Sequence, residues 1–483
     1  MSGYLMDDTY QRPHHSHGPA VTGLLVFAVC LAAQRADIMA GAFGLDGLNL
    51  SSARGIADGV GWRWPHLVGV PPSAATQPLA PVVAIIATLL WRATPDNILL
   101  VQLLNAACLG VAAWATARVV TRWPVPAWMG HVGTVAGYLT VPMVALTRSA
   151  FAVPFAALLL AGLMVTMDGA GQSRGRAAVA GALAALMGLT VGPALILIPA
   201  VALILGRRGN TRVAVAASVA AMVVLAPWIP IMFRGLPAGV EASRLAATGQ
   251  EVQSGWYMVT GVVGALVPTL RGVLRVVAGA VIWLAAVWAA WTLRRVFAGW
   301  LLLLVLALAA AAWPLPQRSW STLLVPWVAP LVVVGLWRLW GANRLTRIPV
   351  GILSVSLLVV FAVPTVTGLV RRTGSELPVD GDSLERWLMS IDNELPPGAV
   401  VASDRDGLVY LHTGRRTVAA PVAGSLGPET VRSWCAAGAS HVAASGLVPG
   451  FSTGLLGLAA DSTIDPLFRL TDGPALYRLP CPD

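Results

Sequence analysis

Charge is scarce in this chain of 483 residues. Only 11% of the residues are charged, 57% are hydrophobic, and the mean hydropathy is +0.73. Soluble domains carry about 25% charged residues. The composition therefore excludes a soluble fold for most of the chain.

Lysine is absent, so all 32 basic residues are arginines, and the net charge is +10. This charge does not predict nucleic-acid binding, because the arginines separate apolar runs and form no basic face with interleaved aromatic residues. Membrane lipids with anionic head groups and phosphate-bearing substrates fit it better.

Carboxylates are scarcer than arginines, and their distribution divides the chain. Of the 22 acidic residues, nine precede residue 371 and thirteen follow it. The early part predicts an α-helical polytopic membrane protein, and the tail at 376–483 predicts a small soluble α/β domain. In the tail we expect a helix at 382–394 and strands at 399–403, 417–420, 441–445, 468–470 and 475–479. Outer acidic residues are too few to predict a divalent metal site, and we expect no cofactor.

Apolar runs separated by arginine or polar clusters predict about eleven membrane spans. They are expected at 19–36, 97–119, 127–146, 149–167, 176–190, 193–207, 212–233, 272–293, 297–313, 319–338 and 347–370. The run 78–92 contains prolines at its start and is too short for a span, which is typical of a re-entrant or interfacial helix.

The arginines predict the orientation of these spans. If 78–92 does not cross, the short arginine-bearing loops between spans all fall on one side, which the positive-inside rule makes cytoplasmic. We therefore expect a cytoplasmic tail at 1–18 and a transmembrane domain at 19–370 in the cytoplasmic membrane. The first outer loop (37–96) and the tail domain (376–483) are then extracytoplasmic.

Cysteine is also rare, with four residues in the chain. Cys30 and Cys108 fall in predicted spans, where they serve as small apolar residues. Cys435 and Cys481 fall in the outer domain, where an oxidising compartment permits a disulfide between them. Two unpaired thiols are the alternative.

The first outer loop is the place where the sequence best supports chemistry. Asp46 follows the first span closely, so its carboxylate is expected just above the membrane, where it can act as a general base towards an acceptor hydroxyl. Arg54 and Asp58 have helical i,i+4 spacing and are candidates for substrate binding, with a surface ion pair as the alternative.

Phosphate binding is predicted around the same loop. Thr76 and Gln77 lie in a proline-bounded turn, which can present hydrogen-bond donors and a helix N-terminus to a lipid-linked phosphate. Arg54 and Arg148 are expected on the outer side, where the positive-inside rule disfavours them, and phosphate binding would explain their presence. Each residue alone has a solvated or structural role as its alternative.

The order of these features resembles the GT-C integral-membrane glycosyltransferases, in particular the protein mannosyltransferase and lipid A aminoarabinose transferase type. The resemblance covers nearly the whole chain. Its matches are Asp46, Ala53 with Ala57, Gly59 with Gly61, the segment Thr76–Leu79, the pair Pro227–Trp228, and the segment from Arg318 to Pro330.

The resemblance implies specific roles. Asp46 would activate the acceptor, while Gln77, Arg148 and Arg54 would hold the phosphate of a polyprenyl-phosphate sugar. The sequence departs from the pattern at Gly47, where a second acidic residue is common, and at Leu50 or Ser51, where an aromatic residue is expected.

The leading hypothesis is inverting sugar transfer from a polyprenyl-phosphate donor to a glycan, lipid or protein acceptor at the outer face of the cytoplasmic membrane. One alternative is a lipid or glycan transporter. Transporters usually carry ionisable groups within spans, and here Asp168 alone falls there, at a span end. A second alternative is a catalytically inactive GT-C-like assembly protein, which the missing second acid favours.

Overall fold

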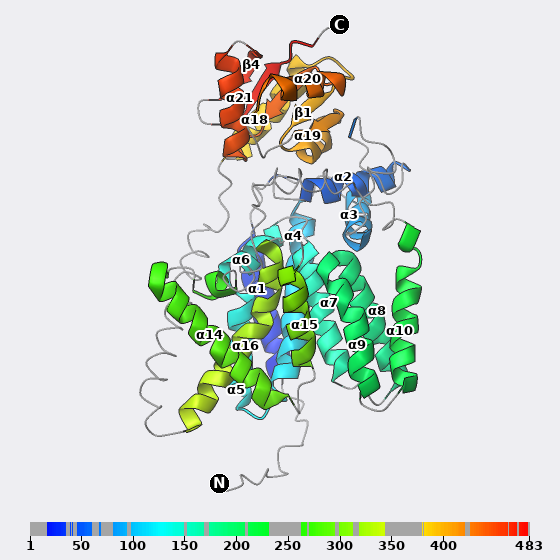
Figure 1. Cartoon of the computed structure of the whole chain (residues 1–483), viewed down its shortest axis with the longest axis vertical. Coiled ribbons are helices and arrows are strands. Elements are labelled where there is room, and N and C mark those ends of the chain that lie inside the picture. Colours follow the sequence, from blue (N-terminus) through cyan, green and yellow to red (C-terminus); the bar gives the residue numbers. More distant parts are fainter. Residues whose placement is uncertain are drawn as a thin grey trace.

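The computed structural model describes two parts, a helical bundle and a small α/β domain, with helix α2 (Asp46–Ala57) between them (Figure 1). The described residues are 17–34, 39, 41, 46–59, 67–68, 81–93, 98–148, 152–168, 173–207, 211–230, 262–267, 270–294, 299–312, 318–342, 379, 381–420, 426–461, 463–470 and 473–481.

The bundle consists of apolar helices packed around one large core. Its α-helices are α1 (Gly18–Ala32), α4 (Ile98–Val120), α5 (Ala127–Tyr138), α6 (Val141–Ala145), α7 (Ala152–Met167), α8 (Arg174–Thr190), α9 (Leu197–Arg207), α10 (Thr211–Leu225), α14 (Gly272–Leu293), α15 (Gly299–Ala312) and α16 (Arg318–Ala342). Two 3-10 helices, η2 (Leu146–Arg148) and η4 (Gly192–Ile196), complete it.

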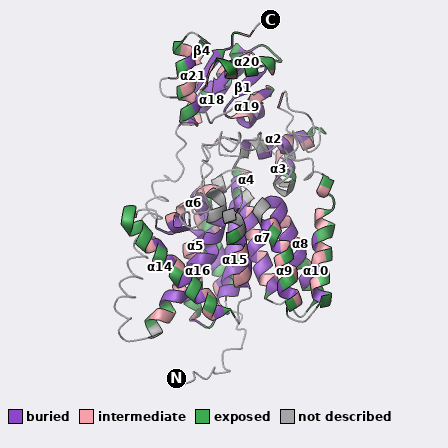
Figure 2. Cartoon of the chain, in the orientation of Figure 1, coloured by how far each residue is buried: buried purple, intermediate pink, exposed green. Residues whose placement is uncertain are grey.

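Apolar side chains also cover much of the outside of the bundle. On α14, Val273 is 77% exposed and Leu284 is 71% exposed, and Figure 2 shows exposed residues along the outer sides of α10 and α14. A helix that is apolar on both its buried and its exposed faces is typical of a membrane-embedded protein.

Three helical segments are long and apolar enough to cross a membrane, namely Leu99–Val120, Gly272–Leu293 and Thr322–Trp340. The other apolar helices of the described residues are shorter, so the predicted count of about eleven spans is not confirmed. The predicted run 127–146 is divided between α5 and α6. The cause is Pro142, which has no N–H to donate to the Tyr138 carbonyl and whose ring would clash with it.

Two more predicted spans differ from the structure or lie outside it. The run 193–207 begins as the 3-10 helix η4 and becomes α-helical at Leu197. The run 347–370 lies outside the described residues. The predicted interfacial segment 78–92 corresponds to α3 (Pro81–Ala93), which has 13 residues.

Glycine allows a close contact between α5 and α16. A Cβ atom at Gly133 of α5 would lie 2.6 Å from the Cα of Pro330, and one at Gly137 would lie 2.6 Å from the Cα of Pro326. Both prolines are inside α16. The two glycines and the two prolines share the same four-residue spacing, so one face of α5 fits directly against α16, as small residues allow in membrane helices.

The tail forms a three-layer α/β domain around a five-stranded sheet of order β2-β1-β3-β5-β4. Strands β1 (Val401–Ser403), β2 (Thr417–Ala419) and β3 (His441–Ala444) are parallel, while β5 (Ala475–Arg478) runs antiparallel to β3 and to β4 (Asp465–Arg469). The helices are α18 (Gly381–Glu394), α19 (Asp406–Thr413), α20 (Pro428–Ala436) and α21 (Pro449–Ala460). The predicted α/β character is confirmed, although β4 begins three residues before the expected start at 468.

Alternation along the strands builds a core on each side of this sheet. Val401 faces a core that includes Trp387 of α18 and Leu408 of α19. Its neighbour Ala402 faces the opposite core, which includes Trp434 of α20 and Phe451 of α21. This is the period of two that a strand buried on both faces requires.

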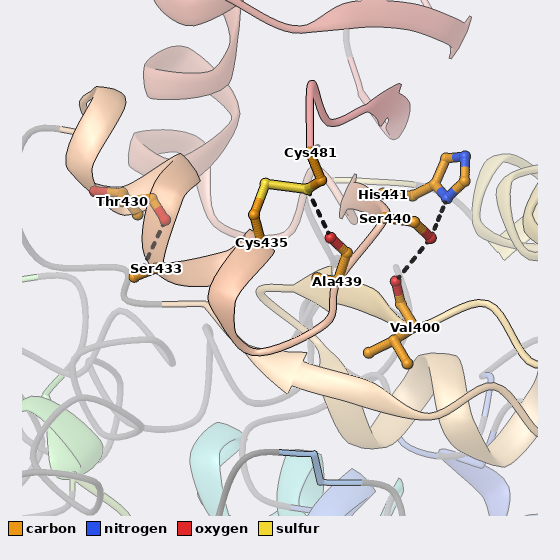
Figure 3. Close-up of a disulfide and its surroundings, with 8 residues drawn as sticks. All are labelled: Val400, Thr430, Ser433, Cys435, Ala439, Ser440, His441 and Cys481. Atoms are coloured by element: carbon orange, nitrogen blue, oxygen red, sulfur yellow. Dashed lines mark hydrogen bonds between the residues drawn. A yellow bond between two sulfur atoms is a disulfide. The ribbon is translucent and has the colours of Figure 1, made fainter. Parts of the chain in front are cut away.

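The chain end is fixed to the domain. Cys435 of α20 and Cys481 form a disulfide (Figure 3). The backbone N–H of Leu479 donates to the Ser440 carbonyl at 3.0 Å, and that of Ser440 donates to the Val400 carbonyl at 3.0 Å. The last strand is therefore held covalently and by hydrogen bonds.

Candidate functional site

The described helices of the loop that follows α1 lie between the bundle and the α/β domain (Figure 1). Helix α2 (Asp46–Ala57) packs against α3 on one side and against α19 on the other (Figure 1). A small apolar cluster joins the three helices: Leu50 and Ala53 from α2, Ala87 from α3 and Leu411 from α19. The loop and the α/β domain thus share a core.

Gly47 is a close contact between the starts of α2 and α19. A Cβ atom there would lie 3.0 Å from the Gly41 carbonyl oxygen, 3.3 Å from the Leu408 backbone nitrogen and 3.4 Å from the Gly407 carbonyl carbon. These are backbone atoms, which cannot move aside as a flexible side chain can. A side chain here would fit only if these backbone atoms moved by a few tenths of an ångström.

Arg54 connects the other end of the same helix pair. Its Nη1 donates to the carbonyl oxygens of Tyr410 at 3.3 Å and Leu411 at 3.4 Å. Both carbonyls belong to the last residues of α19, where the helix dipole is negative. The guanidinium carbon also lies 4.9 Å from the ring centroid of Tyr410 and 5.6 Å from that of Trp91 on α3, which are cation–π distances.

Asp58 completes this arrangement at the surface. Its carboxylate lies 3.7 Å from Arg54 Nε, and its side chain is 53% exposed, so the ion pair contributes little to stability. Burial raises the pKa of Tyr410, and the positive charge of Arg54 opposes that rise. The Tyr410 phenol therefore stays neutral beside the guanidinium.

A strand contact also links the loop to the α/β domain. Leu67 forms a parallel bridge with Thr417 at the start of β2, and the Val68 N–H donates to the Thr417 carbonyl at 3.0 Å. Val68 packs against the core on the α20 side of the sheet. The loop thus extends the free edge of β2, a β-augmentation within one chain.

The predicted site residues are placed as follows. Asp46 is the first residue of α2, next to Gly47, so its backbone adjoins the first turn of α19; its side chain is outside the described part. Arg148 ends η2, and its side chain is likewise undescribed. Thr76 and Gln77 lie outside the described residues. The structure brings Arg54 and Asp58 together.

A polar cluster that the sequence analysis did not single out lies in the bundle near α6, the end that faces α2 and α3 (Figure 1). It comprises Gln34 after α1, Asn105 on α4, and Thr147 in η2. A signal for it exists in the sequence, since the amide side chains at positions 34 and 105 interrupt apolar runs. Their joint burial depends on how α1, α4 and η2 pack.

The domain holds a buried carboxylate at the carboxyl end of β1. Asp404 accepts hydrogen bonds from the Ser445 backbone N–H at 2.9 Å and from its hydroxyl at 2.6 Å. Burial raises the pKa of Asp404, while the Ser445 hydrogen bonds and the charge of Arg405 lower it. Because Ser445 follows β3, this network ties the ends of two parallel strands together.

Asp168, the acid that falls in a predicted span, lies just after α7 and pairs with Arg122 beyond α4. Both side chains are partly solvent-exposed. This is an ion pair between two connecting segments. It does not resemble the buried ionisable group of a transport pathway.

The described residues contain no group of three or more His, Cys, Asp or Glu side chains that could hold a metal ion.

Sequence comparison finds no match for this chain among protein-family profiles or curated proteins. Solved structures do resemble it. ArnT from Cupriavidus metallidurans bound to undecaprenyl phosphate matches with a TM-score of 0.56 at 15% identity, over 95% of this chain and 97% of that one. The apo state of the same protein gives 0.55 at 14% identity.

Two further structures share the arrangement. The archaeal oligosaccharyltransferase AglB from Archaeoglobus fulgidus, in complex with an inhibitory peptide and a dolichol-phosphate, gives a TM-score of 0.52 at 10% identity, over 94% of this chain and 74% of that one. The mycobacterial arabinofuranosyltransferase AftD, as a mutant, gives 0.51 at 13% identity, over 97% of this chain and 42% of that one. At these identities the likeness shows the fold.

Proposed function

We propose that this chain, which has the GT-C fold of these three membrane glycosyltransferases, transfers a sugar from a polyprenyl-phosphate donor to an acceptor. The observation that carries the proposal is the extent of the likeness. It extends over 95% of this chain and 97% of ArnT. Two of these structures contain a bound polyprenyl phosphate, undecaprenyl phosphate in ArnT and dolichol-phosphate in AglB.

In the proposed reaction, an acceptor hydroxyl attacks the anomeric carbon of the donor sugar. A bond forms between the acceptor oxygen and that carbon, while the bond from the carbon to the phosphate oxygen breaks and its electron pair leaves with the polyprenyl phosphate. Asp46 takes the hydroxyl proton as general base. Attack opposite the leaving phosphate inverts the anomeric configuration.

The leaving phosphate needs positive charge and hydrogen-bond donors. We assign this role to Arg148, with Thr76 and Gln77 as further donors. Arg54 receives a different assignment, because its guanidinium already contacts two carbonyls of α19 and two aromatic rings. It holds the α/β domain on helix α2, which begins at Asp46.

The acceptor is a glycan, a lipid or a protein that reaches the outer face of the cytoplasmic membrane. Helix α19 of the α/β domain lies against the first turn of α2. We therefore place the acceptor site between Asp46 and the α/β domain. An acceptor bound at Asp46 would then contact both parts of the chain.

The test of the enzyme class is turnover by the purified protein in liposomes. Polyprenyl-phosphate sugars labelled in the sugar are offered with a membrane and cell-wall fraction as acceptor, and released polyprenyl phosphate is measured with labelled product. We expect acceptor-dependent release from at least one hexosyl or pentosyl donor. Donor binding without release from any donor would contradict the enzyme assignment and favour an inactive assembly protein; movement of intact donor across the liposome membrane would favour a transporter.

A further inference from the structure

The polar cluster at the end of the bundle holds one residue, Thr147, through both its side chain and its backbone. Thr147 is fully buried and Asn105 is 6% exposed. Gln34 Nε2 donates to Thr147 Oγ1 at 2.9 Å, and Asn105 Nδ2 donates to the Thr147 carbonyl at 3.4 Å. The Thr147 hydroxyl in turn donates to the Val144 carbonyl at 2.7 Å.

These contacts come from three separate elements. Gln34 follows α1, Asn105 is on α4, and Thr147 is in η2. The carbonyl that Asn105 contacts belongs to the peptide bond joining Thr147 to Arg148. The cluster therefore fixes both the side chain and the outgoing backbone of Thr147, and with them the backbone from which Arg148 extends.

Such a cluster is costly for a membrane bundle. Amide groups removed from water are unfavourable unless all their hydrogen bonds are made, and within the described part of the chain the buried Gln34 Oε1 has no hydrogen-bond partner. Apolar side chains of similar size would pack here without that cost. Stability alone does not account for these residues.

We propose that Gln34, Asn105 and Thr147 are positioning residues that fix the η2 turn so that Arg148 meets the phosphate of the lipid-linked donor. This inference rests on the proposed function. A charge that stabilises a leaving phosphate must be held in place before reaction, and a displacement of about 1 Å is enough to weaken such a contact substantially.

The experiment is a double-mutant cycle between Thr147→Val and Arg148→Ala in full-length protein, read by polyprenyl-phosphate binding. Thr147→Val keeps the shape and removes the hydroxyl. We expect Thr147→Val to weaken binding about tenfold, which corresponds to about 1.4 kcal/mol. In the Arg148→Ala background it should have no further effect, because Thr147 acts through Arg148. Thr147→Ser, which retains the hydroxyl, should restore binding.

A matched control comes from the same helix as Asn105. Thr116 of α4 is fully buried and forms a 2.9 Å hydrogen bond with the Tyr138 hydroxyl. Thr116→Val therefore removes a buried inter-helix hydrogen bond elsewhere in the bundle. It should lower the thermal unfolding midpoint as much as Thr147→Val does and leave polyprenyl-phosphate affinity unchanged.

Three results would overturn the inference: additive effects of Thr147→Val and Arg148→Ala, equal loss of affinity in Thr116→Val, or no binding of polyprenyl phosphate by the wild type. Because binding is measured without turnover, failure of the two proposals can be told apart. If the effects of Thr147→Val and Arg148→Ala on binding are non-additive but the protein transfers no sugar, only the enzyme assignment is refuted. If the two effects are additive in a protein that does transfer sugar, only the positioning role is refuted.

Discussion

Gly47 lies where the first loop and the α/β domain make backbone contact. The GT-C pattern commonly has a second acidic residue at this place, and the structure gives a physical reason for its absence here. Any side chain would meet the Gly41 carbonyl and the start of α19. The departure from the pattern is thus linked to the docking of α19, and it does not by itself indicate lost activity.

We predict that Gly47→Ala destabilises the contact between α2 and α19 by about 1–3 kcal/mol, the usual cost of overpacking. Cleavage of the full-length protein by a protease at low concentration should accelerate at the segment between the bundle and the α/β domain. The control is Gly457→Ala on α21, where a new Cβ meets nothing within 4 Å; this change should be neutral or stabilise the helix slightly. Equal cleavage rates in Gly47→Ala and wild type would contradict the prediction.

Asp404 gives a prediction about pH. Because burial raises its pKa, the folded protein retains this proton to higher pH than the unfolded chain, in which Asp titrates at about pH 3.9. Protonated Asp404 therefore contributes its full stabilisation of the fold below about pH 3.9. This contribution is lost as pH rises through the pKa of Asp404 in the folded protein. Asp404→Asn does not titrate and keeps an oxygen acceptor for the Ser445 N–H.

The variant Asp404→Asn should therefore gain stability relative to wild type as pH rises, by up to about 1.4 kcal/mol per pH unit within that window. Thermal unfolding of the full-length proteins between pH 4 and pH 8 (about four units) measures it. Asp461→Asn, which removes an exposed carboxylate of the same domain, is the control. If the difference in thermal stability between Asp404→Asn and wild type stays constant with pH, Asp404 does not have a raised pKa in the folded protein.

At the scale of elements, the match of α5 to α16 shows how the bundle is held together. Gly133 and Gly137 place the backbone of α5 against Pro330 and Pro326. Membrane helices gain little from the hydrophobic effect, so close van der Waals contact of this kind carries much of their association.

We predict that Gly133→Ala lowers the thermal unfolding midpoint of the purified protein by several degrees. Its Cβ would lie 2.6 Å from a backbone atom of α16, and overpacking of this kind costs about 1–3 kcal/mol. Gly162→Ala on α7 is the matched control, because its Cβ would lie 3.5 Å from a flexible Leu183 side chain and should be tolerated. The prediction is wrong if the two variants unfold at the same temperature.

The elements differ in how far the sequence could predict them. The helix and strands of the tail follow from alternating apolar patterns between turn residues, and they occur within a few residues of the expected places. The run 127–146 is predicted as one helix because it is mostly apolar and contains no Asp, Glu, Lys or Arg. Its interruption depends on a single proline, Pro142, whose effect on the Tyr138 carbonyl is a backbone property that hydropathy does not express.

At the scale of the whole molecule, the α/β domain is attached to the bundle through the first loop. Three contacts make the attachment: Gly47 against α19, Arg54 at the end of α19, and the Leu67 bridge to β2. All three join residues more than 300 positions apart in the sequence. Sequence pattern and spacing could therefore predict Arg54 only as a charged residue near a membrane surface. Its partners on α19 can be identified only from the folded structure.

The central claim is that Asp46 is the base of a sugar transfer, and the most direct measurement compares Asp46→Asn with Asp58→Asn. Both substitutions remove one carboxylate from the first loop, and Asp58 is an exposed partner of Arg54. Turnover of the accepted donor and binding of polyprenyl phosphate are measured for both in the same liposomes. We predict that Asp46→Asn lowers turnover at least about 100-fold, within the range for loss of a general base, with binding retained, while Asp58→Asn stays within about threefold of wild type. Full activity of Asp46→Asn would contradict the account.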